Sequence, residues 1–344
     1  MSNTSKPFIA IDGRRALRWP QDFRGAYAYH LLAELGFMSR PYDIKVFGDV
    51  LADSALLKKM RLLHPVDLLI TPNDFLWAQM AFPQASHGAD LLHFFDPWVP
   101  IMTRMPQVMT VFQEDLSVRL LPWATRRASA VMTLTRDVKE QLSDKYRTTT
   151  AVVADPHSTI KLSGSPPTRQ EFFLWEPDER TLKIGVNAFS AWLRQSSGRI
   201  KVIVRNVRGD TWVRRLAHHF ALDERLEPVR PATPELWEAL YREARAILVV
   251  GDGDAAFTSA LNGLSAHTPV LALDAPRLQR LLPEDAAFWL SSHDPEHAHQ
   301  TIQALTSAST GQEGQARPAP PSWKETAQVA HSVYLKVLQS TRRL

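Results

Sequence analysis

Residues 244–274 read ARAILVVGDGDAAFTSALNGLSAHTPVLALD, two apolar runs on either side of a helix-forming stretch. Residues 246–250 and 270–273 are short, continuous and rich in Val and Leu, which is typical of strands buried on both faces of a sheet. The helix between them is expected to begin near Asp254 and to extend through Asn262 to Leu264. Strands that alternate with helices indicate βαβ units, so this stretch predicts a parallel sheet.

The same alternation extends in both directions along the chain. Apolar positions 28, 31, 32 and 35 share one helical face, and residues 54–63 form the next predicted helix. The other predicted strands are residues 7–11, 43–47, 67–70, 90–95, 108–112, 130–134, 172–175 and 200–204. We therefore predict an α/β protein with two doubly wound, Rossmann-like domains of similar size.

Two loose stretches divide the chain. Ser163–Thr168 reads SGSPPT and predicts an interdomain linker, so the domains are expected at residues 1–162 and 169–307. Residues 308–321 form a second linker, followed by a C-terminal segment, 322–344, with a helix from Trp323 to about Leu338. Within it, one apolar stripe contains Ala330, Val333, Tyr334, Val337 and Leu338.

Two other helices have clear start signals. Thr233 precedes Pro234, and Asp294 precedes Pro295; in each pair the first residue is suited to cap a helix and the proline to open it.

Composition excludes several classes of protein. The 344 residues are 44% hydrophobic and 22% charged, as in ordinary globular proteins, and the absence of cysteine excludes disulfides and thiolate metal sites. A net charge of +4 gives little electrostatic support for a nucleic-acid reader, although local basic clusters leave contact with anionic lipid heads open. Without a signal peptide or an apolar run of membrane-spanning length, the expected location is the cytoplasm, either free or peripheral to the inner face of the membrane.

The order of segments resembles the group 1 (family 4) retaining glycosyltransferases of the GT-B fold. In the N-terminal half the resemblance rests on Ile9–Arg14 followed by Arg24–Tyr27, and on the strand Ala128–Thr135. In the C-terminal half it rests on Pro234–Ala246, on Thr268–Pro276, and on Ser322–Trp323 with Tyr334 eleven residues later. The resemblance implies two domains facing a cleft and a last helix that returns to the N-terminal domain. It also implies a nucleotide-diphosphate sugar as co-substrate and a glycan, lipid-linked glycan or protein as acceptor.

The resemblance also assigns a donor site. Aligned on Thr268, the Glu-x7-Glu stretch of the family falls on Asp254 and Asn262. This implies that Asp254 is the catalytic residue in contact with the sugar and that Asn262 contacts the ribose. Arg180 and Lys183 lie where the family neutralises the donor diphosphate. The family's Gly-Phe-Gly turn is replaced, and the donor-binding residues at the start of this helix are Ala255, Ala256, Phe257 and Thr258. No cofactor is expected, and no dense Asp cluster suggests a metal, since basic groups would neutralise the leaving group.

On the acceptor side the resemblance points to loops containing Gly25, Gln113 and Glu114. The histidine that follows the Val-Thr-Val strand in the family is absent from Thr110–Asp115.

Each candidate also has a purely structural interpretation. Asp254 is suited to cap its helix, Asn262 to be an ordinary helix residue, and Arg180 and Lys183 to be solvated cations. Gly25 is expected in a turn with either function. Two further segments also have simpler structural readings: Glu114–Asp115 as a surface turn, and His93 as a core histidine.

Three functional hypotheses follow. The first is a glycosyltransferase that is retaining and metal-independent. The alternative is a catalytically inactive GT-B protein that acts as a binding or scaffold partner, because both glycines, the second acid and the histidine are replaced together. The third is another GT-B activity such as sugar-nucleotide epimerisation, against which the trailing helix after Ser322 argues. The sequence identifies neither the donor base nor the acceptor.

Overall fold

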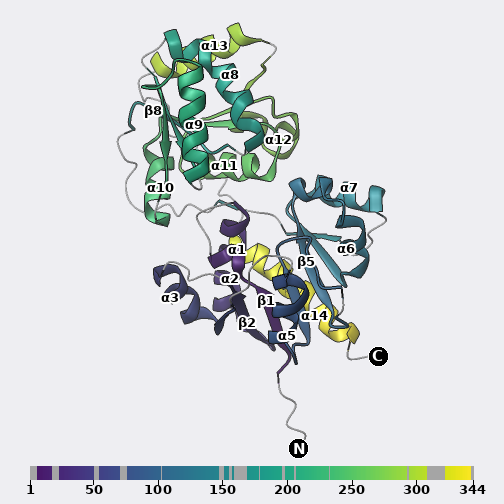
Figure 1. Cartoon of the computed structure of the whole chain (residues 1–344). Helices are drawn as coiled ribbons and strands as arrows, with labels where there is room; N and C mark the ends of the chain where they lie inside the picture. The colour runs from purple at the N-terminus through teal and green to yellow at the C-terminus, as the bar shows by residue number, and fades with distance from the viewer. Residues whose placement is uncertain are drawn as a thin grey trace, which may run out of the picture. The chain divides into compact units, whose positions relative to one another are not determined.

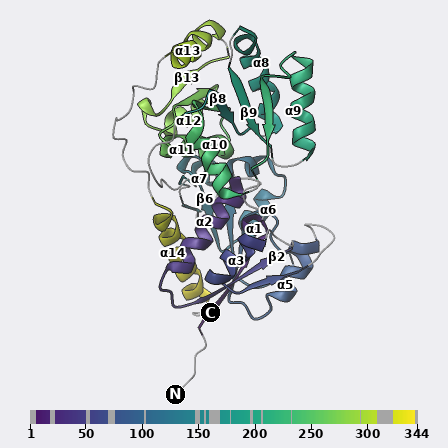
Figure 2. The same cartoon turned by 90° about the vertical axis from the view of Figure 1, so that its left-hand side faces the viewer.

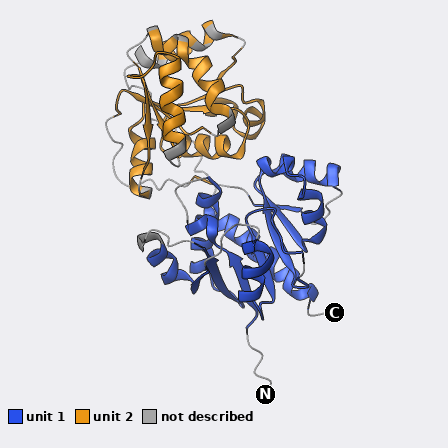
Figure 3. Ribbon diagram, in the orientation of Figure 1, with its two compact units in different colours: residues 1–156, 321–344 blue, residues 157–320 orange. Residues whose placement is uncertain are grey.

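The chain folds into two compact units, each built on its own parallel sheet (Figures 1 and 3). The computed structural model describes residues 6–17, 23–49, 54–69, 76–101, 103–146, 151–154, 157–158, 169–177, 179–195, 198–204, 207–231, 233–292, 294–307 and 322–341. Unit 1 comprises Met1–Pro156 together with Pro321–Leu344, and unit 2 comprises His157–Pro320. The predicted linkers at 163–168 and 308–321 lie outside the described residues.

The sheet of unit 1 has seven strands in the order β3-β2-β1-β4-β5-β6-β7, and all its neighbours are parallel. The strands are β1 (Phe8–Asp12), β2 (Asp43–Gly48), β3 (Val66–Leu68), β4 (Leu91–Phe94), β5 (Gln107–Val111), β6 (Ala130–Thr133) and β7 (Ala151–Val153). The six predicted strands of this half are confirmed. β7 was not predicted from the sequence: it is a three-residue edge strand in which only Ala151 is buried, and so short an apolar run does not by itself indicate a strand.

Helices join these strands and cover the sheet. They are α1 (Arg14–Leu17), α2 (Phe23–Phe37), α3 (Ser54–Leu63), η1 (Trp77–Ala81), α5 (Phe82–Ala85), η2 (Gln113–Ser117), α6 (Leu121–Arg127) and α7 (Arg136–Tyr146). The predicted helix at 54–63 is confirmed with the same bounds, and η1 is a single π-helical turn that periodicity did not indicate.

The C-terminal helix, α14 (Trp323–Thr341), belongs to unit 1 and lies beside α2 (Figures 1 and 2). Its predicted apolar stripe is buried. The Tyr334 hydroxyl is 2.6 Å from Nδ1 of His93, whose Nε2 is 2.9 Å from the hydroxyl of Thr110. His93 is therefore a fully buried core residue with both ring nitrogens bonded, and burial lowers its pKa to about 3. The rings of Trp323 and Tyr27 meet edge to face at 5.5 Å, so polar and aromatic contacts both fix the helix on this unit.

The sheet of unit 2 has six parallel strands in the order β10-β9-β8-β11-β12-β13. They are β8 (Phe172–Trp175), β9 (Arg199–Ile203), β10 (Leu226–Val229), β11 (Ala246–Val250), β12 (Val270–Leu273) and β13 (Phe288–Leu290). β10 and β13, the two edges of this sheet, were not predicted from the sequence. β10 contains Pro228, which an edge strand tolerates but which argues against a strand in a sequence pattern.

The helices of unit 2 are α8 (Glu179–Gln195), α9 (Val207–His219), α10 (Pro234–Glu243), α11 (Asp254–Ser265), α12 (Pro276–Leu281), η3 (Glu284–Ala286) and α13 (Pro295–Ser307). Both predicted helix starts are confirmed. The Thr233 hydroxyl accepts a hydrogen bond from the Leu236 amide at 3.3 Å. The Asp294 carboxylate accepts one from the His297 amide at 3.0 Å.

Candidate functional site

Strand order reverses at one point in each sheet, between β1 and β4 in unit 1 and between β8 and β11 in unit 2. In open α/β sheets, ligands bind beyond the carboxyl ends of the strands at such a switch point. The residues that follow these four strands are therefore the first candidates for a site.

In unit 2, the loop after β11 is Gly251–Asp252–Gly253 and leads directly into α11. Gly251 has a φ of +81°, and a Cβ at this position would lie 2.9 Å from the Thr181 side chain at the start of α8. Glycine is needed here because L residues rarely adopt this φ. The N-cap of α11 is Gly253, with no side-chain cap hydrogen bond. The backbone N–H groups of the first turn of α11 therefore lie at the switch point of this sheet, where a helix N-terminus favours anions.

Asp254 is the first residue of α11 and has no solvent exposure. Its Oδ1 accepts a hydrogen bond from Nη2 of Arg277 at 2.8 Å. The other guanidinium nitrogen of Arg277 donates to the backbone carbonyl of Asp252 at 2.7 Å, and its amide donates to the Asp252 carboxylate at 2.8 Å. One arginine of α12 thus holds both the loop and the first residue of α11. Asp254 does not cap the helix, because the capping position belongs to Gly253.

A buried polar cluster lies beside this loop. The Tyr241 hydroxyl donates to Oε2 of Glu176, the residue after β8, at 2.8 Å, and lies 2.9 Å from the Ser259 hydroxyl. Burial, and then the negative charge of Glu176, raise the pKa of Tyr241 well above its usual value. Asn262 is fully buried one turn further along α11, and its Oδ1 accepts a hydrogen bond from Ser158 at 3.3 Å. Carboxylate, amide and hydroxyl groups therefore line α11 from the residue after β8 to the middle of the helix.

The remaining donor-side candidates flank this cluster. Arg180 is in the first turn of α8, and its side chain lies outside the described part of the chain. Lys183 is one turn further along the same helix and is exposed. Ala255–Thr258 are 5–8% exposed. The Phe257 N–H donates to the Gly253 carbonyl, so of these four residues only Ala255 and Ala256 have N–H groups without an acceptor within the helix.

In unit 1, Gly25 does not occupy a loop or a turn, contrary to the expectation. It is buried in the first turn of α2, which begins at Phe23. The helix starts early because Phe23 and Tyr27 both pack on Phe112, with ring centroids 5.6 Å and 5.8 Å from it. Arg24, the residue before Gly25, anchors this first turn through ion pairs.

Gln113 and Glu114 open η2, the short 3₁₀ helix after β5, and are partly exposed. The interpretation of Glu114–Asp115 as a surface turn is wrong for Asp115, which is 2% exposed. The Asp115 carboxylate accepts a hydrogen bond from the Phe112 amide at 3.0 Å.

A chain of ion pairs that was not predicted from the sequence lies at the switch point of unit 1. Arg24 lies 2.8 Å from the Asp115 carboxylate and 3.4 Å from Asp96, which follows β4. Arg15 makes a second contact with Asp96 at 2.9 Å. The guanidinium of Arg24 also stacks 4.6 Å from the Phe112 ring. The sequence did contain a signal for these ion pairs: Asp96 follows β4 and Asp115 follows β5. The carboxyl ends of neighbouring parallel strands meet at one edge of the sheet, which favours a short distance between these acids.

Electrostatics favour the charged form of Arg24, whereas burial disfavours the charged form of Asp115. Burial opposes the charge of Arg24, but Asp115 and Asp96 outweigh it, and the pKa of Arg24 is raised. Burial also raises the pKa of Asp115 above its usual value, while Arg24 acts in the opposite direction. A polar ligand at this edge would therefore meet an arginine whose orientation is already fixed.

Neither metal ligands nor membrane-spanning segments emerge from the described residues. In that part of the chain, no group of three or more His, Cys, Asp or Glu side chains is placed to hold a metal ion. No helix of the described chain is both long and apolar enough to cross a bilayer.

No protein-family model matches this chain, and no curated protein matches it. Solved structures do. Sucrose-phosphate synthase from Thermosynechococcus elongatus is 13% identical with a TM-score of 0.64, the match covering 97% of this chain and 94% of that one. WaaG, a glycosyltransferase of lipopolysaccharide biosynthesis, is 12% identical with a TM-score of 0.63, over 97% and 98% of the two chains. HepE from Anabaena, solved with UDP and glucose, is 15% identical with a TM-score of 0.62, over 98% and 99%. At such identities the likeness shows the fold, and the predicted GT-B architecture is confirmed.

Proposed function

We propose that this chain is a glycosyltransferase of the group 1 (family 4) type, which transfers a sugar from a nucleotide-diphosphate donor to a glycan, lipid-linked glycan or protein. The observation that carries the proposal is the polar cluster of Glu176, which follows β8, with Tyr241 and with Ser259 and Asn262 along the middle of α11. Supporting evidence is that Glu176 follows β8 and α11 follows β11, the two strands between which strand order reverses and ligands bind in open α/β sheets. Support comes from HepE, which has the same fold and was solved with UDP and glucose.

The chemistry requires stabilisation of an anionic leaving group, because the diphosphate departs as the anomeric carbon becomes cationic. The first-turn N–H groups of α11 and the cations Arg180 and Lys183 would neutralise that charge without a metal ion. The resemblance assigns a ribose hydroxyl to Asn262; because this side chain is fully buried and bonded to Ser158, the ribose hydroxyl would have to take the place of Ser158. Asp254 is fully buried against Arg277, which favours a role in positioning the first turn of α11 over direct contact with the sugar.

The test is a binding panel on the full chain with UDP, GDP, ADP, CMP and dTDP. A nucleotide at about 100 times its Kd stabilises the protein by about 2.7 kcal/mol, which raises Tm by several degrees. Asn262→Ala and Lys183→Ala are expected to reduce this rise, while Arg194→Ala, an exposed cation at the far end of the same helix, keeps it. No response to any nucleotide would refute the donor site.

A second candidate function is a non-catalytic binding protein. The contact between Arg277 and Asp254 favours it, because Arg277 occupies the carboxylate to which the resemblance assigns the sugar. The two functions differ in turnover. A transferase releases nucleoside diphosphate from the matching sugar nucleotide, in the presence of EDTA, and gives a product whose anomeric configuration by NMR equals that of the donor. Nucleotide binding without any release of sugar would favour the second function.

A further inference from the structure

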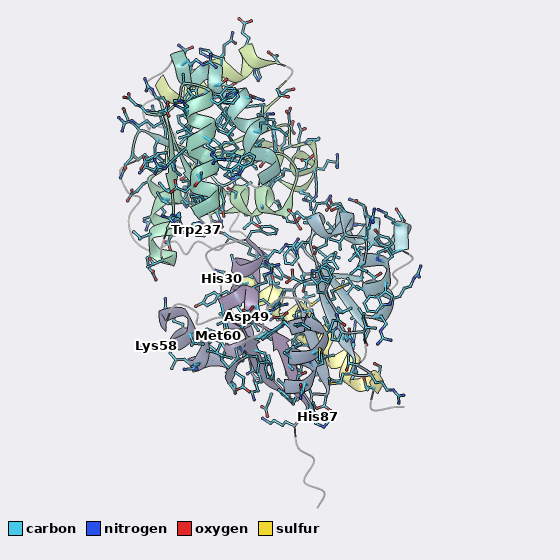
Figure 4. All side chains as sticks on the ribbon, viewed as in Figure 1. His30, Asp49, Lys58, Met60, His87 and Trp237 are labelled. Carbon is cyan, nitrogen blue, oxygen red and sulfur yellow. The ribbon has the colours of Figure 1, made fainter. Side chains whose placement is uncertain are left out.

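The outer face of α3 combines exposed leucine with exposed cations. Met60 is fully buried and marks the side of α3 that packs on the rest of unit 1, whereas Leu62 is 86% exposed. Lys58, Lys59 and Arg61 are exposed around Leu62 on the remaining helix surface. Figure 4 labels Lys58 and Met60 on this peripheral helix. Because Leu62 is so exposed, its apolar surface contributes little to the stability of the fold, and burying it against a partner would be favourable.

A second exposed apolar residue lies next to this face. The last turns of α2 and α3 pack together, because a Cβ added at Gly36 would lie 2.8 Å from Cβ of Leu63. The His64 side chain also meets the carbonyl of Leu32 at 2.8 Å, which ties the segment after α3 to α2. Phe37, the residue after Gly36, is 76% exposed. Phe37 and Leu62 are therefore at the same end of the helix pair, and we call Phe37, Lys58, Lys59, Arg61 and Leu62 the α3 surface.

The charge of this region is positive. The sequence of α3, SALLKKMRLL, contains three cations and no acid. The acids of the adjoining elements are Glu34, partly exposed in the last turns of α2, Asp43, which is exposed at the start of β2, and Asp67, which pairs with Lys45. Arg40, half-buried after α2, adds another cation. With the Lys45–Asp67 pair set aside, Lys58, Lys59, Arg61 and Arg40 outnumber Glu34 and Asp43.

We propose that the α3 surface docks on a lipid bilayer rich in anionic headgroups. Apolar side chains flanked by Lys and Arg are suited to the interface, where the apolar groups enter the boundary of the acyl chains and the cations contact the headgroups. A protein partner fits less well, because lysine is depleted at protein–protein interfaces. The helices of this parallel α/β unit run from the carboxyl edge of the sheet to its amino edge, so Phe37 and Leu62 lie away from the Arg24 ion pairs. Docking would leave those ion pairs uncovered.

The test is cosedimentation of the full chain with vesicles of phosphatidylcholine alone, or of phosphatidylcholine with about one-third phosphatidylglycerol. We expect binding to the anionic vesicles only, and binding that weakens as salt is added. Each Lys or Arg near such a surface accounts for about a fivefold change in partitioning, so Lys58→Gln with Arg61→Gln should weaken binding about 25-fold. Leu62→Ser should weaken it about tenfold by removing the inserted apolar group.

Matched controls lie on other surfaces. Leu236→Ser changes a 54% exposed leucine on α10, and Arg215→Gln with Lys336→Gln removes two exposed cations from α9 and α14. These variants should bind the anionic vesicles as the unchanged chain does. The altered positions are exposed, so Tm should stay constant and loss of binding would not report unfolding.

The proposal is overturned if the unchanged chain does not bind anionic vesicles, or if Leu62→Ser and the matched controls bind equally. Sedimentation equilibrium tests whether a second copy of the chain covers the α3 surface instead. A dimer that Leu62→Ser dissociates, in a chain that ignores vesicles, would assign the α3 surface to self-association. The readout needs no catalytic turnover, so this proposal and the proposed transferase activity succeed or fail separately.

Discussion

Arg277→Met should destabilise unit 2 strongly, because it removes the cation that faces a fully buried carboxylate. The Arg277 and Asp254 side chains are 5% and 0% exposed, and their charged atoms are 2.8 Å apart. The same guanidinium also donates to the carbonyl of Asp252. Methionine keeps most of the side-chain volume, so the change is mainly one of charge and hydrogen bonding.

The magnitude follows from the asymmetry of buried ion pairs. Removing one partner of such a pair costs about 3–5 kcal/mol, since the other charge remains in a poorly solvated site. For a unit of this size, 1 kcal/mol corresponds to about 2–4 °C, so the Tm of unit 2 should fall by about 6–20 °C. Replacing both partners, as in Arg277→Met with Asp254→Leu, should cost less than Arg277→Met alone, because no buried charge is left.

Calorimetry of the full chain measures the fall, and hydrogen exchange of peptides covering residues 246–282 locates it. Arg280→Met is the matched control, an exposed arginine on the same helix, which should change stability by less than about 0.5 kcal/mol. The reasoning is refuted if Arg277→Met costs less than about 1 kcal/mol. It is equally refuted if the double variant costs the sum of the two single changes.

Two further predictions concern unit 1. Burial lowers the pKa of His64 to about 4 and of His93 to about 3, from 6.5. Protonation of these histidines therefore favours the unfolded chain. Their contribution to the free energy of unfolding is fully present above pH ~6.5, and it falls by about 1.4 kcal/mol per histidine for each pH unit between pH ~6.5 and pH ~4. A Tm that stays constant between pH 7 and pH 4.5 would contradict this. Tyr334→Phe removes the 2.6 Å hydrogen bond to His93 and should lower the free energy of unfolding by about 1–3 kcal/mol, measured by thermal unfolding. Tyr146→Phe is the control and should cost less, because the hydroxyl of Tyr146 makes a 3.4 Å contact; equal costs for the two variants would refute the prediction.

For much of the candidate site, the sequence predicted which residues take part but not which residues they contact. Asp254 and Asn262 were singled out by their place in a strand–helix–strand stretch, and both lie in α11 as expected. Their partners were not accessible. Arg277 follows Asp254 by 23 positions, and Ser158 precedes Asn262 by 104, so no local pattern links the members of either pair.

The sequence by itself determined the two-unit α/β fold, because a strand buried on both faces needs a continuous apolar run and a covering helix needs an apolar stripe. The runs at 246–250 and 270–273 became neighbouring central strands, and the stripe on α14 became buried. Only the tertiary structure decided which charges meet. Strand order in a parallel sheet brings remote carboxyl ends together, and this places Arg24 between Asp96 and Asp115 and Tyr241 against Glu176. Those pairings depend on the chain's path through space, which local periodicity does not encode.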